Sequence, residues 1–261
     1  MQRLLAQFAG YGRTLVAFSG GVDSGLVLAA AVRALGAGQV GAVTAVSPAL
    51  PRAEREAAAA FCRDLGVAHH AVETDELGVA GYRDNGPQRC YFCKSTLLDA
   101  ARATAAEHDY ATVATGTNAD DIAARHRPGI RAAAERGART PLADAGLDKA
   151  AVRGLAREWG LAIWDKPQAA CLSSRIAYGI PITPARLSRV ERAEVAIRRT
   201  IPVTDLRVRD LGDAVRVEVD EAALAWAGDP GIVAAVREAG FPDLPVTVER
   251  FRSGSMNQMN H

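Results

Sequence analysis

The chain has 261 residues, of which 49% are hydrophobic and 23% charged, and its formal net charge is +1. These values are typical of a globular protein with one large domain, or with a medium-sized domain and a small one. The balanced charge argues against an extended nucleic-acid interface, and no apolar run is long enough to predict a membrane span. The N-terminus has no signal-type pattern, and four cysteines are too few for a secreted disulfide framework. We therefore expect a cytoplasmic protein whose thiols bind a metal or take part in chemistry.

Short apolar strands alternate with helical patterns over the first 160 residues or so. This alternation predicts βαβ units in an α/β fold, with a doubly wound parallel sheet and ligands outside the carboxyl ends of its strands. The expected strands are residues 14–18, 40–46, 69–73, 111–115 and 138–142, and the expected helices are 24–35, 52–65, 92–107 and 148–159.

The pattern changes after Lys166, where a segment containing Pro, Gly and Ser shows no clear period. A helix opened by Thr183-Pro184, two alternating strands, a helix opened by Asp229-Pro230 and a last strand then predict a small α+β module. We therefore expect an α/β domain over 1–166, a crossover segment over 167–183, and a small α+β domain for substrate binding or oligomerisation over 184–261.

The segment Phe18-Ser19-Gly20-Gly21-Val22-Asp23-Ser24 joins the first expected strand to the first expected helix. Such a turn presents backbone N–H groups and the positive end of a helix dipole to an anion. The two glycines allow close backbone approach, the two serines supply hydroxyl donors, and the aspartate is suited to Mg²⁺. The segment lacks the Gly-Lys-Ser/Thr ending of a Walker loop and instead resembles the PP-loop of the ATP pyrophosphatase superfamily. That resemblance implies cleavage of ATP to AMP and pyrophosphate, with phosphates bound by Ser19, Gly20, Gly21, Val22, Asp23 and Ser24.

A second loop, Gly116-Thr117-Asn118-Ala119-Asp120-Asp121, follows the fourth expected strand. By itself it is equally typical of an Asn/Asp turn. Beside the PP-loop it resembles the GTN-x-DD loop of the same superfamily. The resemblance implies that Gly116 and Asn118 lie near the nucleotide, and that Asp121 is a weaker candidate than Asp23 for Mg²⁺.

Cys90 and Cys93 form a CxxC pair, and Cys171 follows much later in the chain. A lone CxxC is compatible with a redox pair, half a zinc site or part of a cluster. Three thiolates can also hold a [4Fe–4S] cluster that leaves one iron open to an exogenous ligand. Cys62 lies beside Phe61 in an Ala-rich helical pattern, so we expect it to be buried packing.

The region Asp165-Lys166-Pro167, Ala170-Cys171-Leu172-Ser173-Ser174-Arg175-Ile176 and Tyr178-Gly179 resembles the LarE family of ATP-dependent sulfur transferases. The resemblance continues through Arg207-Val208-Arg209, Arg216-Val217-Glu218 and residues 252–257. It implies that the carboxylates of pyridinium-3,5-biscarboxylic acid mononucleotide are adenylated and that sulfur then replaces oxygen. The product belongs to the biosynthesis of the nickel-pincer nucleotide cofactor of lactate racemase, and the resemblance also implies a homo-oligomer.

Two sources of sulfur occur in that family. Cys171 could donate its own sulfur, or it could join Cys90 and Cys93 around a cluster whose open iron carries sulfide from a sulfide donor. The CxxC pair favours the cluster, because a sacrificial cysteine needs no CxxC.

The resemblance assigns catalytic roles to Cys171, Asp23, Ser174, Arg175 and Glu218. Arg207 and Arg209 are two residues apart on an expected strand, so they share a face and could clamp a substrate phosphate. The alternatives are a tRNA thiolase with the same three cysteines, an ATP-dependent amidating ligase, and a nucleotide-binding redox sensor.

Overall fold

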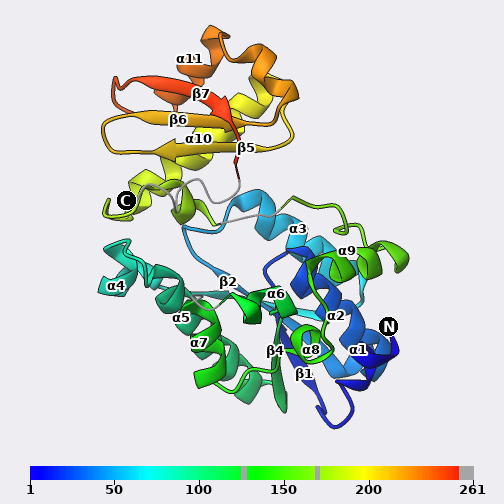
Figure 1. The fold of residues 1–261 in the computed structure, drawn as a ribbon. Coiled ribbons are helices and arrows are strands. Elements are labelled where there is room, and N and C mark those ends of the chain that lie inside the picture. The colour runs from blue at the N-terminus through cyan, green and yellow to red at the C-terminus, as the bar shows by residue number, and fades with distance from the viewer. Residues whose placement is uncertain (125–127, 168–170, 253–261) are drawn as a thin grey trace. The chain divides into compact units, whose positions relative to one another are not determined.

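The structure is a computed structural model that describes residues 1–124, 128–167 and 171–252. The chain divides into two compact units (Figure 1). The first consists of Met1–Glu76 and Cys90–Ala169, and the second of Leu77–Arg89 and Ala170–His261. A short early segment of the chain thus belongs with the C-terminal part. None of the described helices is long and apolar enough to cross a membrane.

The first unit contains a parallel four-stranded sheet in the order β3-β2-β1-β4, which confirms the predicted α/β fold. The order reverses beside β1, so the loops that follow β1 and β4 meet at a switch point, where open α/β sheets bind ligands. The strands are β1 (Thr14–Ala17), β2 (Val40–Val46), β3 (Ala68–Glu73) and β4 (Thr112–Thr115).

The strand expected over 138–142 does not form. Arg139 makes a single bridge to Ala114, and the residues after it turn into the short helix α8 (Pro141–Asp144). Pro141 has the fixed φ of a first helical position and lacks the N–H that a strand would use, which favours this outcome.

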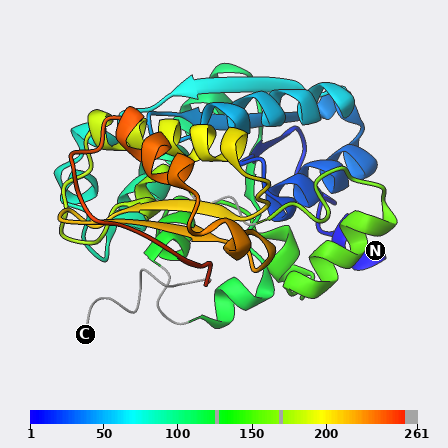
Figure 2. The ribbon, with the colours of Figure 1, turned by 90° about the horizontal axis from the view of Figure 1, so that it is seen from above.

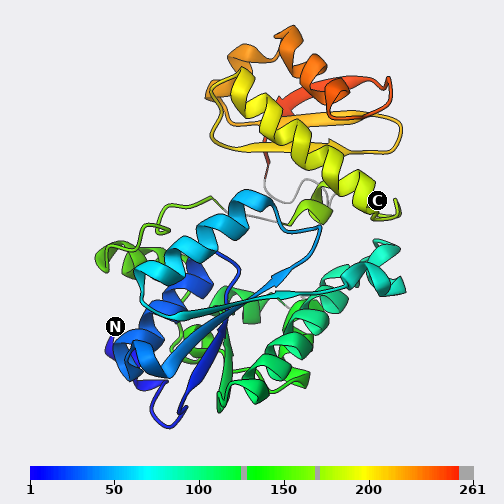
Figure 3. The same cartoon turned by 180° about the vertical axis from the view of Figure 1, so that it is seen from behind.

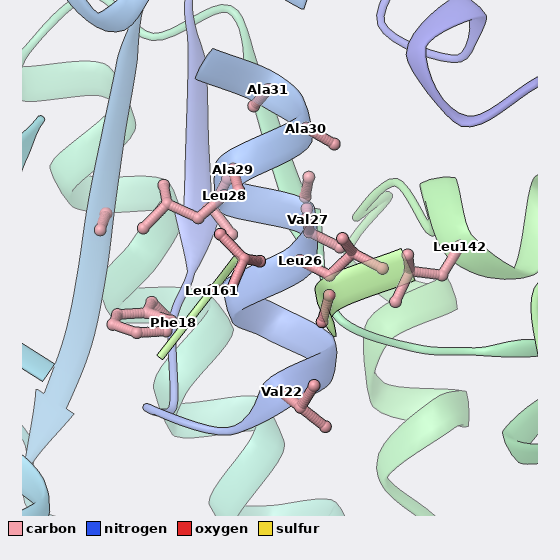
Figure 4. Packing of buried hydrophobic residues seen from close by; sticks show 14 of the residues in the cluster. Phe18, Val22, Leu26, Val27, Leu28, Ala29, Ala30, Ala31, Leu142 and Leu161 are labelled. Atoms are coloured by element: carbon pink, nitrogen blue, oxygen red, sulfur yellow. The ribbon is translucent and has the colours of Figure 1, made fainter. Parts of the chain in front are cut away.

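Helices pack on both faces of the parallel sheet because side chains alternate along β1. Val16 and Phe18 belong to the core cluster that contains residues of α2 and α3, whereas Leu15 and Ala17 belong to a cluster with residues of α5. Helix α2 is apolar on nearly every side and is enclosed by this core (Figure 4). The helices of the first unit are α1 (Gln2–Ala6), α2 (Val22–Leu35), α3 (Arg52–Asp64), α5 (Arg89–Glu107, of which Arg89 lies in the second unit), α6 (Ala119–Ala123), α7 (Pro128–Glu135), α8 and α9 (Lys149–Glu158), with the 3-10 turn η1 (Ala37–Gln39).

The second unit contains a three-stranded sheet in the order β5-β6-β7, in which β5 and β6 are antiparallel and β6 and β7 parallel. The helices α10 and α11 lie together on one side of this sheet (Figures 2 and 3). Thr183 and Asp229 cap them by accepting backbone N–H groups of the first turn, as the Thr-Pro and Asp-Pro pairs predicted. The elements are α4 (Ala80–Arg83), η3 (Leu172–Arg175), α10 (Pro184–Thr200), β5 (Leu206–Asp210), β6 (Val215–Val219), η4 (Ala222–Trp226), α11 (Pro230–Glu238) and β7 (Val246–Arg250); η2 (Glu76–Gly78) begins at the end of the first unit.

The segment that carries Cys171 runs beside β5, the edge strand of the second sheet. The backbone N–H of Ala177 donates to the carbonyl of Asp210 at 2.9 Å, and Ile176 forms a bridge with Asp210. This pairing satisfies part of an otherwise open strand edge. It also brings Ser174 and Arg175 next to the side chains of β5.

Candidate functional site

The PP-loop adopts the strand–turn–helix geometry of an anion site. β1 ends at Ala17 and α2 begins at Val22, with Gly21 as N-cap. Gly20 has φ +76°, a left-handed conformation that strains any side chain other than glycine. The Ser24 hydroxyl holds the turn closed, because it lies 3.2 Å from the Ser19 amide and donates to the Gly21 carbonyl at 3.2 Å. The N–H groups at the start of α2 therefore face the loop, where phosphate oxygens can accept them.

Gly116 lets the second loop approach the PP-loop backbone. A Cβ atom at this position would lie 2.5 Å from the Ser24 nitrogen and 2.8 Å from its Cα. The approach brings Asn118, which follows β4, to the first turn of α2. The Nδ2 atom of Asn118 donates to Oδ1 of Asp23 at 3.3 Å.

Asn118 also begins a helix of its own, α6, with a reciprocal capping box. Its side chain accepts the amide of Asp121 at 3.0 Å, and the Asp121 carboxylate accepts the amide of Asn118 at 3.3 Å. The Asp121 side chain is thus half-buried and directed to its own helix cap. The two predicted loops meet at the switch point of the sheet.

Two lysines that sequence reasoning left without a role lie at the PP-loop. Lys149, the first residue of α9, forms an ion pair through Nζ with Oδ2 of Asp23. Lys166 donates through Nζ to the carbonyl of Gly20 at 3.0 Å and to Oε2 of Glu54 at 2.6 Å. Both ammonium groups are partly exposed, so they add positive charge where phosphates would bind.

Arg207 and Arg209 are buried on β5, on the face opposite to Val208, which packs in the core. Arg209 forms a two-pronged ion pair with Oε2 of Glu218, at 3.0 Å from Nε and 2.7 Å from Nη2, and also donates to the carbonyl of Ser174. Arg207 lies over the ring of Phe251. Burial and the positive charge of Arg175 lower the pKa of Arg207 to about 10, so the surroundings disfavour its charge.

Arg175 ties the Cys171 segment to helix α10. Its guanidinium group donates from Nε to Oε1 of Glu194 at 2.9 Å and from Nη1 to the Cys171 carbonyl at 3.1 Å. The Ser174 hydroxyl donates to the same carbonyl at 2.8 Å. The structure thus gathers Ser174, Arg175, Arg207, Arg209 and Glu218 in the second unit. Glu194, which belongs to no recognisable sequence motif, joins this group through its ion pair with Arg175.

The cysteines differ in environment. Cys62 is fully buried, as predicted, and burial raises the pKa of its thiol to about 11. Cys90 is exposed and Cys93 half-buried on one turn of α5, so both lie on one side of the helix. Cys171 is half-buried and precedes η3.

The three candidate cluster ligands are divided between the units, with Cys90 and Cys93 in the first and Cys171 in the second. Within residues 1–124, 128–167 and 171–252, no three His, Cys, Asp or Glu side chains gather as a metal site. The three-thiolate cluster therefore stays a prediction. Residues 252–257 also carry part of the family resemblance. Of these, Arg252 is described by the structure, and residues 253–257 lie outside the described residues.

The parallel sheet and its glycine-rich loop define an ATP-using enzyme of the PP-loop class. In agreement, the family model for NAD synthase matches residues 5–114, which include β1, the PP-loop and most of β4.

The particular family follows from similarity over nearly the whole chain. The chain is 33% identical over 256 residues to the pyridinium-3,5-bisthiocarboxylic acid mononucleotide synthase of Lactiplantibacillus plantarum, covering 97% of this chain and 92% of that protein. It is also 41% identical over 260 residues to an uncharacterized protein of Synechocystis sp., covering 98% and 96%. The chain belongs to the LarE family and is an ATP-using, sulfur-transferring enzyme.

Proposed function

We propose that this enzyme adenylates the carboxylates of pyridinium-3,5-biscarboxylic acid mononucleotide and replaces an oxygen of each with sulfur, in the biosynthesis of a nickel-pincer nucleotide. The observation that carries the choice of substrate is the similarity to the Lactiplantibacillus plantarum synthase, because it covers both units of the chain. The geometry of each unit supports one part of the reaction.

The first unit supports ATP activation. The helix α2 N-terminus, Ser19 and Ser24 supply donors for phosphate oxygens, and Lys149 and Lys166 supply positive charge. Asp23 would hold Mg²⁺, because its carboxylate has capacity for the ion beside the amide of Asn118. Metal binding at Oδ2 requires Lys149 to exchange Asp23 for another anion, and a phosphate group supplies one. Charge that develops on the phosphates during adenylation is then stabilised by groups already in place.

The second unit supports recognition of the mononucleotide phosphate. Burial and the charge of Arg175 lower the pKa of Arg207, so the charged form of its guanidinium group is disfavoured. A bound anion would stabilise that charged form. Arg209 is held by Glu218, which fixes the direction of its guanidinium group. Arg175, fixed by Glu194, directs Ser174 and the Cys171 carbonyl to the same region. We assign phosphate binding to Arg207 and Arg209, and substrate positioning to Ser174, Arg175 and Glu218.

For the sulfur, we propose that Cys90, Cys93 and Cys171 hold a [4Fe–4S] cluster. The donor set fits this group, because Cys90 and Cys93 share one side of α5 and none of the three is fully buried. When bound, the cluster supplies an open iron that carries sulfide. Donation of sulfur by Cys171 itself is the second candidate, favoured by its place beside Ser174 and Arg175.

The deciding experiment combines product mass and pyrophosphate release with the pyridinium mononucleotide as substrate, compared with tRNA and with ammonia. We expect pyrophosphate and a thiocarboxylate product with the mononucleotide, and neither with tRNA nor with ammonia. Asp23→Ala should lower pyrophosphate release by about 10²-fold or more, because the metal ligand is lost. Release at the wild-type rate would show that Asp23 holds no metal.

Iron and sulfide analysis of anaerobically purified protein tests the source of sulfur. Cys93→Ala should remove the brown chromophore and the iron, whereas Cys62→Ala, at a buried thiol of raised pKa, should retain both. Unchanged iron in Cys93→Ala would refute the cluster. A wild-type protein without iron, in which the Cys171 peptide loses its sulfur during turnover, would establish the sacrificial route.

A further inference from the structure

A chain of hydrogen bonds leads from strand β3 through β2 to the PP-loop, all within the first unit. The Nε2 atom of His69 on β3 lies 2.9 Å from Oγ1 of Thr44 on β2, and the Thr44 hydroxyl donates to the carbonyl of Phe18 at 2.8 Å. His69 is the register partner of Ala42, which belongs with Phe18 to the core cluster that contains residues of α3. Thr44 and Phe18 are buried, so the bond between them is shielded from water.

This chain has one direction, because a carbonyl oxygen accepts hydrogen bonds and cannot donate them. The single hydroxyl hydrogen of Thr44 is committed to Phe18, so Thr44 accepts from His69, and Nε2 of His69 carries the hydrogen. Burial, together with His70 and Arg55, lowers the pKa of His69, so the ring is neutral at pH 7 and has one N–H group. The hydrogen bonds therefore select the tautomer with the hydrogen on Nε2.

The chain continues on the other side of the Phe18–Ser19 peptide. This peptide is trans and planar, so the Phe18 carbonyl and the Ser19 N–H point in opposite directions. The Ser19 N–H donates to Oγ of Ser24 at 3.2 Å, and the Ser24 hydroxyl donates to the Gly21 carbonyl at 3.2 Å. The Phe18 amide donates to the carbonyl of Val43 at 2.8 Å, so β2 holds both backbone polar groups of Phe18.

Each link donates to the next, and hydrogen bonds arranged in one direction polarise one another. We propose that His69 and Thr44 are positioning residues of the PP-loop: through the Phe18 carbonyl they hold the Ser19 N–H toward the turn where the phosphates of ATP bind. Neither side chain touches the nucleotide. The use of the Ser19 N–H for phosphate rests on the proposed function, whereas the hydrogen-bond chain does not.

The first test examines the protein without nucleotide by NMR. The ¹⁵N shifts of the His69 ring should show the hydrogen on Nε2, and a hydrogen on Nδ1 alone would overturn the chain. Thr44→Val removes the hydroxyl and keeps a side chain of similar shape. Hydrogen exchange of the Ser19 amide should become about tenfold faster in this variant, because one side of the peptide is released. Thr44→Ser, which keeps the hydroxyl, should restore slow exchange.

Thr112→Val is the matched control. Thr112 begins β4 and donates through Oγ1 to the carbonyl of Tyr11 at 2.7 Å, so its replacement removes the same kind of bond at the opposite end of the strands. It should leave exchange of the Ser19 amide at the wild-type rate. Equal acceleration in Thr44→Val and Thr112→Val would show a general loss of stability and would overturn the proposal.

The second test is titration with ATP and Mg²⁺. Thr44→Val should raise the Kd for ATP about three- to tenfold, the effect of one hydrogen bond, while Thr112→Val leaves it unchanged. His69→Leu should raise the Kd about two- to threefold, and His69→Gln, whose side-chain amide can still donate, should recover most of the affinity. A wild-type Kd in folded Thr44→Val would overturn the positioning role. If wild type bound no ATP, the proposed phosphate site would fail, and the tautomer and the Ser19 exchange rate would still decide the chain.

Discussion

Replacement of Gly116 by alanine tests how closely the PP-loop and the loop after β4 approach each other. The added Cβ would lie 2.5 Å from the Ser24 nitrogen, 2.8 Å from its Cα and 2.9 Å from the carbonyl carbon of Asp23. These are backbone atoms in the first turn of α2, a helix enclosed by the core, so no flexible side chain can move aside. Either the loop or the helix N-terminus must shift.

The size of the effect follows from two opposing contributions. Overpacking lowers the free energy of unfolding by about 1–3 kcal/mol. The smaller conformational freedom of alanine in the unfolded chain raises it by about 0.4–1 kcal/mol. We therefore expect Gly116→Ala to lower the free energy of unfolding by about 1–2 kcal/mol and Tm by about 2–8 °C. Because the atoms displaced belong to the PP-loop, the Kd for ATP should rise about tenfold.

The assay is calorimetric unfolding together with titration of ATP and Mg²⁺. Gly154→Ala is the matched control, because Gly154 lies inside α9 with nothing within 4 Å of its added Cβ. That substitution should raise the free energy of unfolding by about 0.5–1 kcal/mol, with ATP affinity unchanged. If Gly116→Ala instead matched Gly154→Ala in both measurements, the close approach of the two loops would be refuted.

Three further outcomes are expected. Cys62, with a thiol pKa of about 11, should react with iodoacetamide at pH 8 at least about a hundredfold more slowly than exposed Cys90, and equal rates would contradict its burial. Burial lowers the pKa values of His69 and His70 below the usual 6.5, so the unfolded chain binds more protons and the free energy of unfolding should fall as pH drops below 6.5. In His70→Gln, the free energy of unfolding measured at a series of pH values should depend less steeply on pH. An unchanged pH dependence would contradict the lowered pKa of His70. Arg207→Met should raise the Kd for the mononucleotide about tenfold or more without changing the Kd for ATP, and parallel changes in both would contradict its assignment to the substrate phosphate.

The sequence alone determined those features that depend on neighbouring residues. Alternation of apolar strands and helices predicted the parallel sheet, and the order of strand, glycines, acid and helix predicted the PP-loop. Local pattern also predicted the buried Cys62 and the capped starts of α10 and α11. It was wrong at 138–142, where the short helix α8 begins at Pro141, because the conformational restriction of proline outweighed a weak strand pattern.

The tertiary structure decided the side-chain partners. Lys149 pairs with Asp23 across 126 residues, and Lys166 with Glu54 across 112. Lys166 belongs to a segment that resembles the LarE family, yet no spacing rule assigns either ammonium group to a carboxylate so far away in the chain. Their positions depend on how α9 and the residues after it pack, which local periodicity does not encode.

The same distinction holds for the thiols and their surroundings. The CxxC pair and Cys171 are evident in the sequence because of their residue type and spacing. The hydrogen bonds from Asn85 and Arg89 to the Cys171 segment are not evident in the sequence, since these two residues form no motif and their partners lie about 90 residues away. Sequence identifies groups whose chemistry is intrinsic, whereas the contacts that orient them arise only when distant segments are packed together, because such contacts depend on the whole fold.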